Sequence, residues 1–174
     1  MLSLRLLVHA ILEEYALPWD GKHGVSHWAR VLENGIRLAK LTGAKTEIVQ
    51  LFAVFHDARR VNESVDLEHG ERGAELAAAC RGRWFNLVDD DFNLLYAACA
   101  FHADGGTDAD VSIQTCWDAD RLDLGRVGIR PEPSKLCTRA ARQLVPWADG
   151  RACFDILPDL VRVEWGIDTR GWGR

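Results

Sequence analysis

Apolar residues recur at helical spacing along most of this 174-residue chain. The clearest example is a single helix face formed by residues at positions i, i+3, i+4 and i+7: Ile48, Leu51, Phe52 and Phe55. The segment from Val31 to Ala39 repeats the pattern, and so does a stripe that runs from Leu94 to His102. Alternating patterns typical of strands are scarce. The sequence therefore predicts an all-α fold, a compact bundle of about six to eight helices.

Several residues mark where these helices begin and end. Gly43 is expected to cap the C-terminus of one helix, and Thr46 to cap the N-terminus of the next. The acidic run Asp89–Asp91 suits a helix start, because carboxylates stabilise the positive end of the helix dipole. Residues 170–174 are expected to form a loose tail. Further helices are expected near residues 2–16, 68–81, 110–123 and 133–144.

The length of the chain suits one domain, which we place at residues 1–174. Apolar residues make up 48% of the chain and charged residues 27%, enough for a sizeable core. Within this domain we expect a core that carries the chemical motifs at about residues 23–128. C-terminal helices and a tail are expected at residues 131–174, where prolines are frequent.

Charge and composition also bear on partners and location. A formal charge of −5 argues against binding to duplex nucleic acid, which requires a basic surface. Five cysteines without a Cys-x-x-Cys pair indicate small buried side chains in a reducing compartment. No apolar run approaches the ~18 residues that span a bilayer, so we expect a cytoplasmic protein with no membrane partner. For Trp147, Trp165 and Trp172 we favour core packing over a base-stacking pocket or a homodimer contact.

The adjacent residues His56 and Asp57 end a helix that is otherwise built to be buried. Removing a carboxylate from water costs free energy unless a partner compensates. A divalent metal is one such partner, and histidine with aspartate is a common ligand set. The alternative is an aspartate that caps a loop beside a hydrogen-bonded core histidine.

Two further polar residues, His102 and Asp120, share this unusual placement. They lie on apolar stripes of their helices, and His27 and His69 lie at helix starts. Polar side chains that face a core need partners. If the helices pack around one core, these groups can meet, and a metal ion would satisfy them together.

This arrangement resembles the HD-domain superfamily of metal-dependent phosphohydrolases, whose signature is His, then His-Asp, then Asp on separate helices. The flanking text Ser-His-Trp-Ala-Arg-Val and Ala-Asp-Arg-Leu is similar to that family as well. The resemblance implies that His27, His56, Asp57 and Asp120 bind a divalent metal ion, which would be Mn, Fe, Co, Ni, Mg or Zn. Asp118, two residues before Asp120, would then support the site from behind or form an ion pair.

The resemblance also suggests roles for residues near the ligands. Some HD proteins use further histidines to bind a second metal or to contact phosphate, so His69 and His102 are candidates, each with a structural role as the alternative. Glu63 is a candidate to activate the attacking water. Arg59 and Arg60 are candidates to bind substrate phosphate, although either could instead form a surface ion pair.

The activity implied by the resemblance is hydrolysis of a phosphoester, of a nucleotide or a related small molecule, by a metal-activated water. One alternative is an HD-type oxygenase with two irons, completed by His69 and His102. Another is a non-catalytic module that binds a metal or a nucleotide. The text His-Asp-Ala-Arg-Arg after the motif argues against the Gly-Tyr-Pro subgroup of cyclic-dinucleotide phosphodiesterases.

Overall fold

The computed structural model describes residues 4–172 of the chain. Over these residues it forms eight α-helices and two 3-10 turns, with no strand. The elements are α1 (Leu4–Leu12), α2 (Val25–Thr42), α3 (Thr46–Phe55), α4 (His69–Cys80), α5 (Asp89–Phe101), α6 (Val111–Arg121), η1 (Leu124–Val127), η2 (Pro133–Lys135), α7 (Arg139–Cys153) and α8 (Leu160–Val163). The prediction of an all-α bundle of six to eight helices is confirmed.

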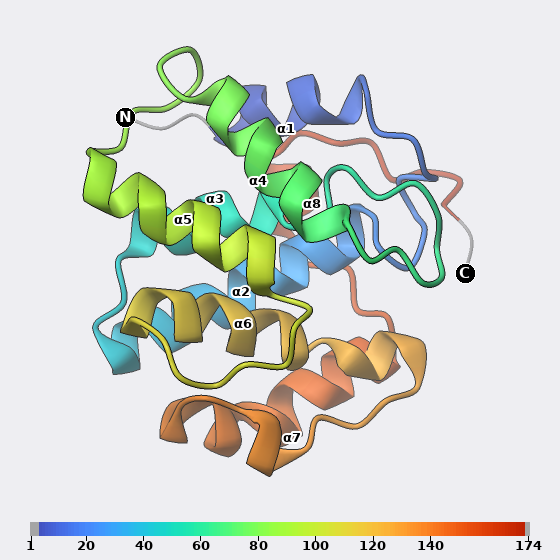
Figure 1. Cartoon of the computed structure of the whole chain (residues 1–174). Coiled ribbons are helices and arrows are strands. Elements are labelled where there is room, and N and C mark those ends of the chain that lie inside the picture. The colour runs from blue at the N-terminus through green and yellow to red at the C-terminus, as the bar shows by residue number, and fades with distance from the viewer. Residues whose placement is uncertain (1–3, 173–174) are drawn as a thin grey trace.

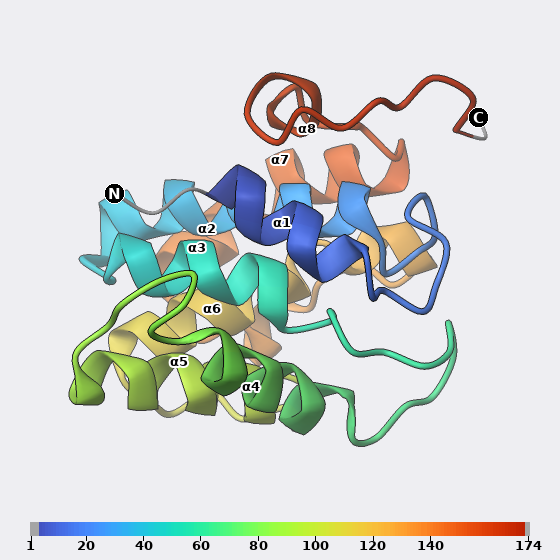
Figure 2. The ribbon, with the colours of Figure 1, turned by 90° about the horizontal axis from the view of Figure 1, so that it is seen from above.

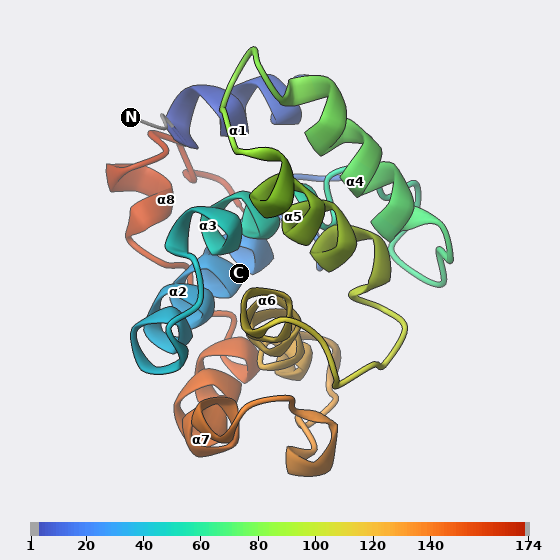
Figure 3. The ribbon, with the colours of Figure 1, turned by 60° about the vertical axis from the view of Figure 1, so that its left-hand side comes forward.

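Helices α2 and α3 form a hairpin at the centre of the molecule (Figure 2). Helix α6 packs against both, and α5 covers α3 and carries α4 on its outer side (Figure 1). Helices α7 and α8 lie against the opposite side of α2 (Figure 3). Helices α2, α4, α5 and α6 therefore all pack against α3.

Helix α3 is buried on nearly all sides, as expected for a short helix with apolar residues around its whole circumference. Every residue from Leu51 to Ala58 is buried. The chain therefore delivers His56 and Asp57 into the interior, at the point where α3 ends.

Two glycines allow α4 to approach the ends of α3 and α5 closely. A Cβ atom on Gly73 would lie 2.5 Å from the carbonyl oxygen of Phe55, and one on Gly70 would lie 2.6 Å from that of Cys99. Real Cβ atoms do not approach backbone this closely, so only glycine permits the packing. As a result His69, the first residue of α4, lies beside both helix ends.

Most expected helix positions agree with the structure, but the helix expected near 133–144 begins and ends later than predicted. Residues 133–135 form only a 3-10 turn, and α7 begins at Arg139. The hydroxyl of Thr138 accepts a hydrogen bond from the amide of Ala141, and this cap sets the start of α7. Pro146 lies inside α7 instead of ending it.

Of the two predicted helix caps, the structure has Gly43 but not Thr46 in the expected position. Gly43 has a φ of 78° and donates its amide to the carbonyl of Ala39, which confirms the C-cap. Thr46 is the first residue of α3, and Lys45 occupies the N-cap position without a side-chain hydrogen bond.

The C-terminal region is more ordered against the core than expected. Trp165 is fully buried and Trp172 packs partly against the core, so residues up to 172 are not a loose tail. Residues 173–174 of the expected tail lie outside the described residues. Within the described part of the chain, every helix is too short or too polar to cross a bilayer.

Candidate metal centre

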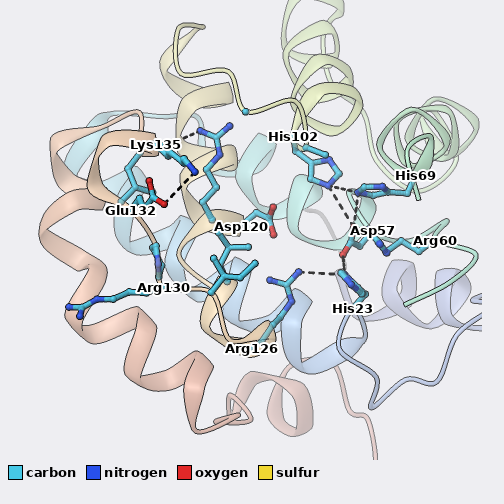
Figure 4. Close-up of a pocket in the computed structure, with 17 residues that line it drawn as sticks. His23, Asp57, Arg60, His69, His102, Asp120, Arg126, Arg130, Glu132 and Lys135 are labelled. Carbon is cyan, nitrogen blue, oxygen red and sulfur yellow. Dashed lines mark hydrogen bonds and ion pairs between the residues drawn. The ribbon is translucent and has the colours of Figure 1, made fainter. Parts of the chain in front are cut away.

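Six of the predicted ligands meet at one place in the interior. Four are imidazoles and two are carboxylates, and they come from α2, the ends of α3 and α5, the start of α4, and α6: His27, His56, His102, His69, Asp57 and Asp120. Figure 4 shows Asp57, His69, His102 and Asp120 converging on this point. We refer to these six residues as the ligand cluster.

One half of the cluster is formed by His27, His56 and Asp120. The Nε2 atoms of His27 and His56 are 3.0 Å apart. The Oδ1 atom of Asp120 lies 3.4 Å from the first of these nitrogens and 3.8 Å from the second. The Oδ2 atom of Asp57 approaches the same pair, at 3.5 Å from His27 Nε2.

The other half is formed by His69 and His102, whose Nε2 atoms are 2.9 Å apart. Here it is the Oδ1 atom of Asp57 that approaches, at 3.4 Å and 3.7 Å from the two nitrogens. The two oxygens of Asp57 thus serve different halves, and this side chain is only 2% exposed. The cluster comprises two groups that could each hold a metal ion, with Asp57 shared between them.

The remaining ring nitrogens determine where the hydrogens lie. Three of the histidines form a hydrogen bond from Nδ1 to a backbone carbonyl oxygen: His56 to Phe52, His69 to Asp66, and His102 to Cys99. The Nδ1 atom of His27 lies 2.7 Å from the carboxylate of Asp123. Because these acceptors carry no hydrogen, every Nδ1 must donate.

Each Nε2 therefore presents a lone pair, and the nitrogens of each pair face one another at about 3 Å. Two lone pairs at this separation repel unless a cation lies between them. That cation is either an extra proton or a metal ion. Neutral imidazoles held by Nδ1 hydrogen bonds are the usual geometry of metal-ligating histidines, so the donor set fits two metal ions.

Burial and the facing charges set the protonation of the cluster. Burial lowers the pKa of His56 to about 3, despite the nearby carboxylates. Burial also acts to lower the pKa of His27, but the carboxylates around it, Asp120 first, raise it to about 9. Burial acts to raise the pKa of Asp57 and Asp120, yet the imidazoles hold both well below their usual range. At neutral pH the carboxylates are ionised, and a proton on His27 takes the place that a metal ion would fill.

Asp120 and Asp118 point in different directions, as residues two apart on a helix must. Asp120 faces the cluster. The carboxylate of Asp118 accepts hydrogen bonds from the amides of Cys137 and Thr138 just before α7. The prediction that Asp118 supports the metal ligands is therefore corrected, because its carboxylate positions α7.

The two adjacent arginines also separate. The guanidinium of Arg60 is buried, with Nη1 3.6 Å from Asp57 Oδ1. Arg59 instead pairs with Glu14 at 2.5 Å. The prediction that Arg59 contacts substrate phosphate is corrected, because its side chain does not line the cavity beside the cluster.

Glu63 lies near the cluster but does not contact it. Its nearest titratable neighbour is His23, whose Nε2 atom lies 3.9 Å from the Glu63 carboxylate. Both carboxylate oxygens are shielded from solvent and have no hydrogen-bond partner among the described residues. A role in activating water stays a prediction.

Sequence reasoning missed His23, Arg30 and Asp123 at this site. His23 donates from Nδ1 to Asp57 at 2.8 Å, and Asp123 accepts from both His27 and Arg30. Their spacing was a usable signal: His23 precedes His27 by four residues, and Asp123 follows Asp120 by three. Either offset places side chains on one side of a helical turn.

Four residues of the cluster line a pocket of about 320 Å³: Asp57, His69, His102 and Asp120. His27 and His56 lie fully buried behind them. Basic residues are frequent in its lining: Arg60, Arg121, Arg126, Arg130 and Lys135. The far wall comes from the segment between α6 and α7, visible on the left of Figure 4. These four cluster residues can therefore be reached from the pocket.

The chain matches no protein-family model, no curated protein and no solved structure. What can be said of its function depends on the residues of this site.

Proposed function

We propose that the protein is a metal-dependent phosphohydrolase with an HD-type site. One observation carries the proposal: two pairs of facing imidazole nitrogens share a buried aspartate, Asp57, on the floor of a pocket lined by basic residues. The His, His-Asp, Asp order of the ligands along the chain supports it as well.

In this proposal His27, His56 and Asp120 hold one divalent ion, and His69 and His102 hold a second, with Asp57 contacting both. Four imidazoles favour a transition metal such as Mn, Fe, Co, Ni or Zn over Mg, which prefers oxygen ligands. Bound there, such ions polarise a phosphoryl group and lower the pKa of coordinated water toward ~7.

The side chains around the ligands would then orient the substrate and the shared carboxylate. Arg60, beside Asp57, is placed to hold phosphate oxygens through charge-assisted hydrogen bonds. His23 contacts Asp57 and lies near Glu63, so it would keep the shared carboxylate in position.

Elemental analysis and a phosphatase screen test the proposal. The purified protein is analysed for metals and then assayed over small phosphoesters and nucleotides with each divalent ion. We expect metal-dependent release of phosphate that falls at least ~100-fold on His56→Ala, because a metal ligand is lost. Phosphate release that survives both His56→Ala and Asp57→Ala would refute it.

A second candidate is an oxygenase with two irons, which the same geometry favours because all six ligands are present. Oxygen uptake by the iron-loaded protein in the presence of a small organic substrate would support this reading. A single bound ion that is not iron would count against it. Tight metal and phosphate binding without any turnover would instead indicate a binding module.

A further inference from the structure

Arg126, in η1, is held rigidly against the ligand cluster. Its side chain is 8% exposed and lines the pocket, and Figure 4 shows it pointing toward His23. Its Nε donates to the carbonyl of Lys22 at 3.0 Å, and its Nη1 donates to the carbonyl of Asp123 at 3.1 Å. These carbonyls fix the orientation of the guanidinium but do not neutralise its charge.

No carboxylate of the described chain forms a hydrogen bond with Arg126. The nearest one belongs to Asp123 at 3.9 Å, and it already accepts hydrogen bonds from His27 and Arg30. The guanidinium therefore presents its positive charge to the pocket, where an anion is favoured once the carboxylates of Asp57 and Asp120 are neutralised.

The Nη2 atom of Arg126 has no acceptor among residues 4–172. It faces Nδ1 of His23 at 3.4 Å, but that nitrogen lies 2.8 Å from the carboxylate of Asp57 and must donate there. A guanidinium cannot accept a hydrogen bond, so two donors face each other. A buried donor aimed into a pocket without an acceptor indicates a ligand that accepts.

The rest of the pocket restricts the organic part of such a ligand. The wall opposite the cluster includes four apolar side chains: Leu124, Ile129, Pro131 and Leu136. Among the described residues no phenylalanine, tyrosine or tryptophan lines the pocket. A nucleobase is commonly held by stacking on such rings, so the lining suits an aliphatic group better than a base.

We propose that Arg126 binds the dianionic phosphate or phosphonate group of a small ligand whose organic part is aliphatic. The proposal rests on the proposed function in that the metal ions must neutralise Asp57 and Asp120 before a dianion can enter. It deepens that function by replacing a nucleotide with a small aliphatic phosphate as the substrate class.

Binding of inorganic phosphate tests the role of Arg126 without any need for turnover. Calorimetric titration compares the metal-loaded protein with Arg126→Gln and with Arg59→Gln, which removes an arginine outside the pocket. We expect phosphate affinity to fall ~10-fold or more for Arg126→Gln, because a charge-assisted hydrogen bond is lost, and to stay unchanged for Arg59→Gln. Elemental analysis must show equal metal content in all three proteins.

Arg126→Lys provides a second variant if the glutamine variant folds poorly. Lysine keeps the charge but cannot make the two bonds to main-chain carbonyls, so phosphate affinity should again fall. Wild-type phosphate affinity in a fully metal-loaded Arg126→Gln protein would overturn the assignment.

Non-hydrolysable phosphonates test the aliphatic part. We expect propylphosphonate to bind more tightly than methylphosphonate, by about fourfold per buried methylene, and more tightly than a nucleoside 5′-monophosphate. Tighter binding of the nucleotide would overturn this part. Phosphate binding through Arg126 without hydrolysis of any ester would refute the hydrolase and keep the anion site. Turnover by Arg126→Gln with an unchanged KM would refute the assignment of Arg126 as the anion site and keep the hydrolase.

Discussion

At the scale of single residues, Asp57 connects the two halves of the ligand cluster because its two oxygens face different imidazole pairs. Losing this side chain should affect both proposed ions, whereas losing a ligand from one half should affect one. The number of metal ions bound per chain therefore tests whether Asp57 is shared between the two halves.

We expect two metal ions per chain in the wild-type protein, about one in His102→Ala, and close to none in Asp57→Asn. Elemental analysis after gel filtration measures all three. Asp118→Asn serves as the control, because its buried carboxylate contacts the start of α7 instead of the cluster. Full metal content in Asp57→Asn would contradict the shared-ligand geometry.

Asp123 gives a second prediction at this scale. It accepts the Nδ1 hydrogen of His27 and so fixes which nitrogen of that ring faces the metal position. We expect Asp123→Asn to weaken metal binding ~10- to 100-fold, measured by competition with a chelator. Asp155→Asn is a matched control, since Asp155 also pairs with Arg30 but is exposed and does not contact His27. Equal losses in both variants would assign the effect to Arg30.

Sequence reasoning reached His56, His102 and Asp120 because polar side chains on apolar helix faces are conspicuous. The other three cluster residues were singled out mainly through the resemblance to the HD signature and its additional histidines. Sequence reasoning did not reach Arg126, whose importance comes from carbonyls of Lys22 and Asp123 that a linear pattern does not bring together. It also treated Arg59 and Arg60 alike, although adjacent side chains point in different directions where α3 ends.

At the scale of helices, the start of α7 also depends on a contact between residues that are distant in the chain. Its start depends on Thr138 and on the carboxylate of Asp118, which is 20 residues away in the chain. Local patterns place a helix near the prolines but cannot include a hydrogen bond from another helix. The central helices were predicted well because their apolar faces alone determine which side is buried.

Close packing of α4 gives a prediction for this scale. We expect Gly73→Ala to lower the free energy of unfolding by about 1–3 kcal/mol, because the new Cβ would meet the Phe55 carbonyl at 2.5 Å. Urea unfolding of the metal-free protein measures it. Gly150→Ala in α7 is the control: its Cβ would have no neighbour within 4 Å, so up to about 1 kcal/mol of added stability is expected. Gly73→Ala with wild-type stability would contradict the close approach.

At the scale of the whole molecule, a buried group of ionisable side chains makes stability depend on pH. The folded protein raises the pKa of His27 to about 9, so this residue contributes stability that is complete below about pH 6.5 and is lost as the pH rises toward 9. The folded protein lowers the pKa of His56 to about 3, so its effect is opposite: stability is lost as the pH falls from about 6.5 toward 3.

The metal-free protein should therefore be most stable near pH 6.5. Each residue costs up to about 1.4 kcal/mol per pH unit on its own side of the maximum, which corresponds to a Tm change of about 2–4 °C per kcal/mol for a chain of this size. A metal ion displaces the proton of His27, so the loss of stability above pH 6.5 should disappear on metal loading. Thermal unfolding between pH 5.5 and 9, with a chelator and with saturating metal, measures both curves. If the chelated protein kept a constant Tm from pH 6.5 to 9, His27 would not hold the proton that the metal is expected to replace, and the argument that a cation must lie between the paired imidazoles would fail with it.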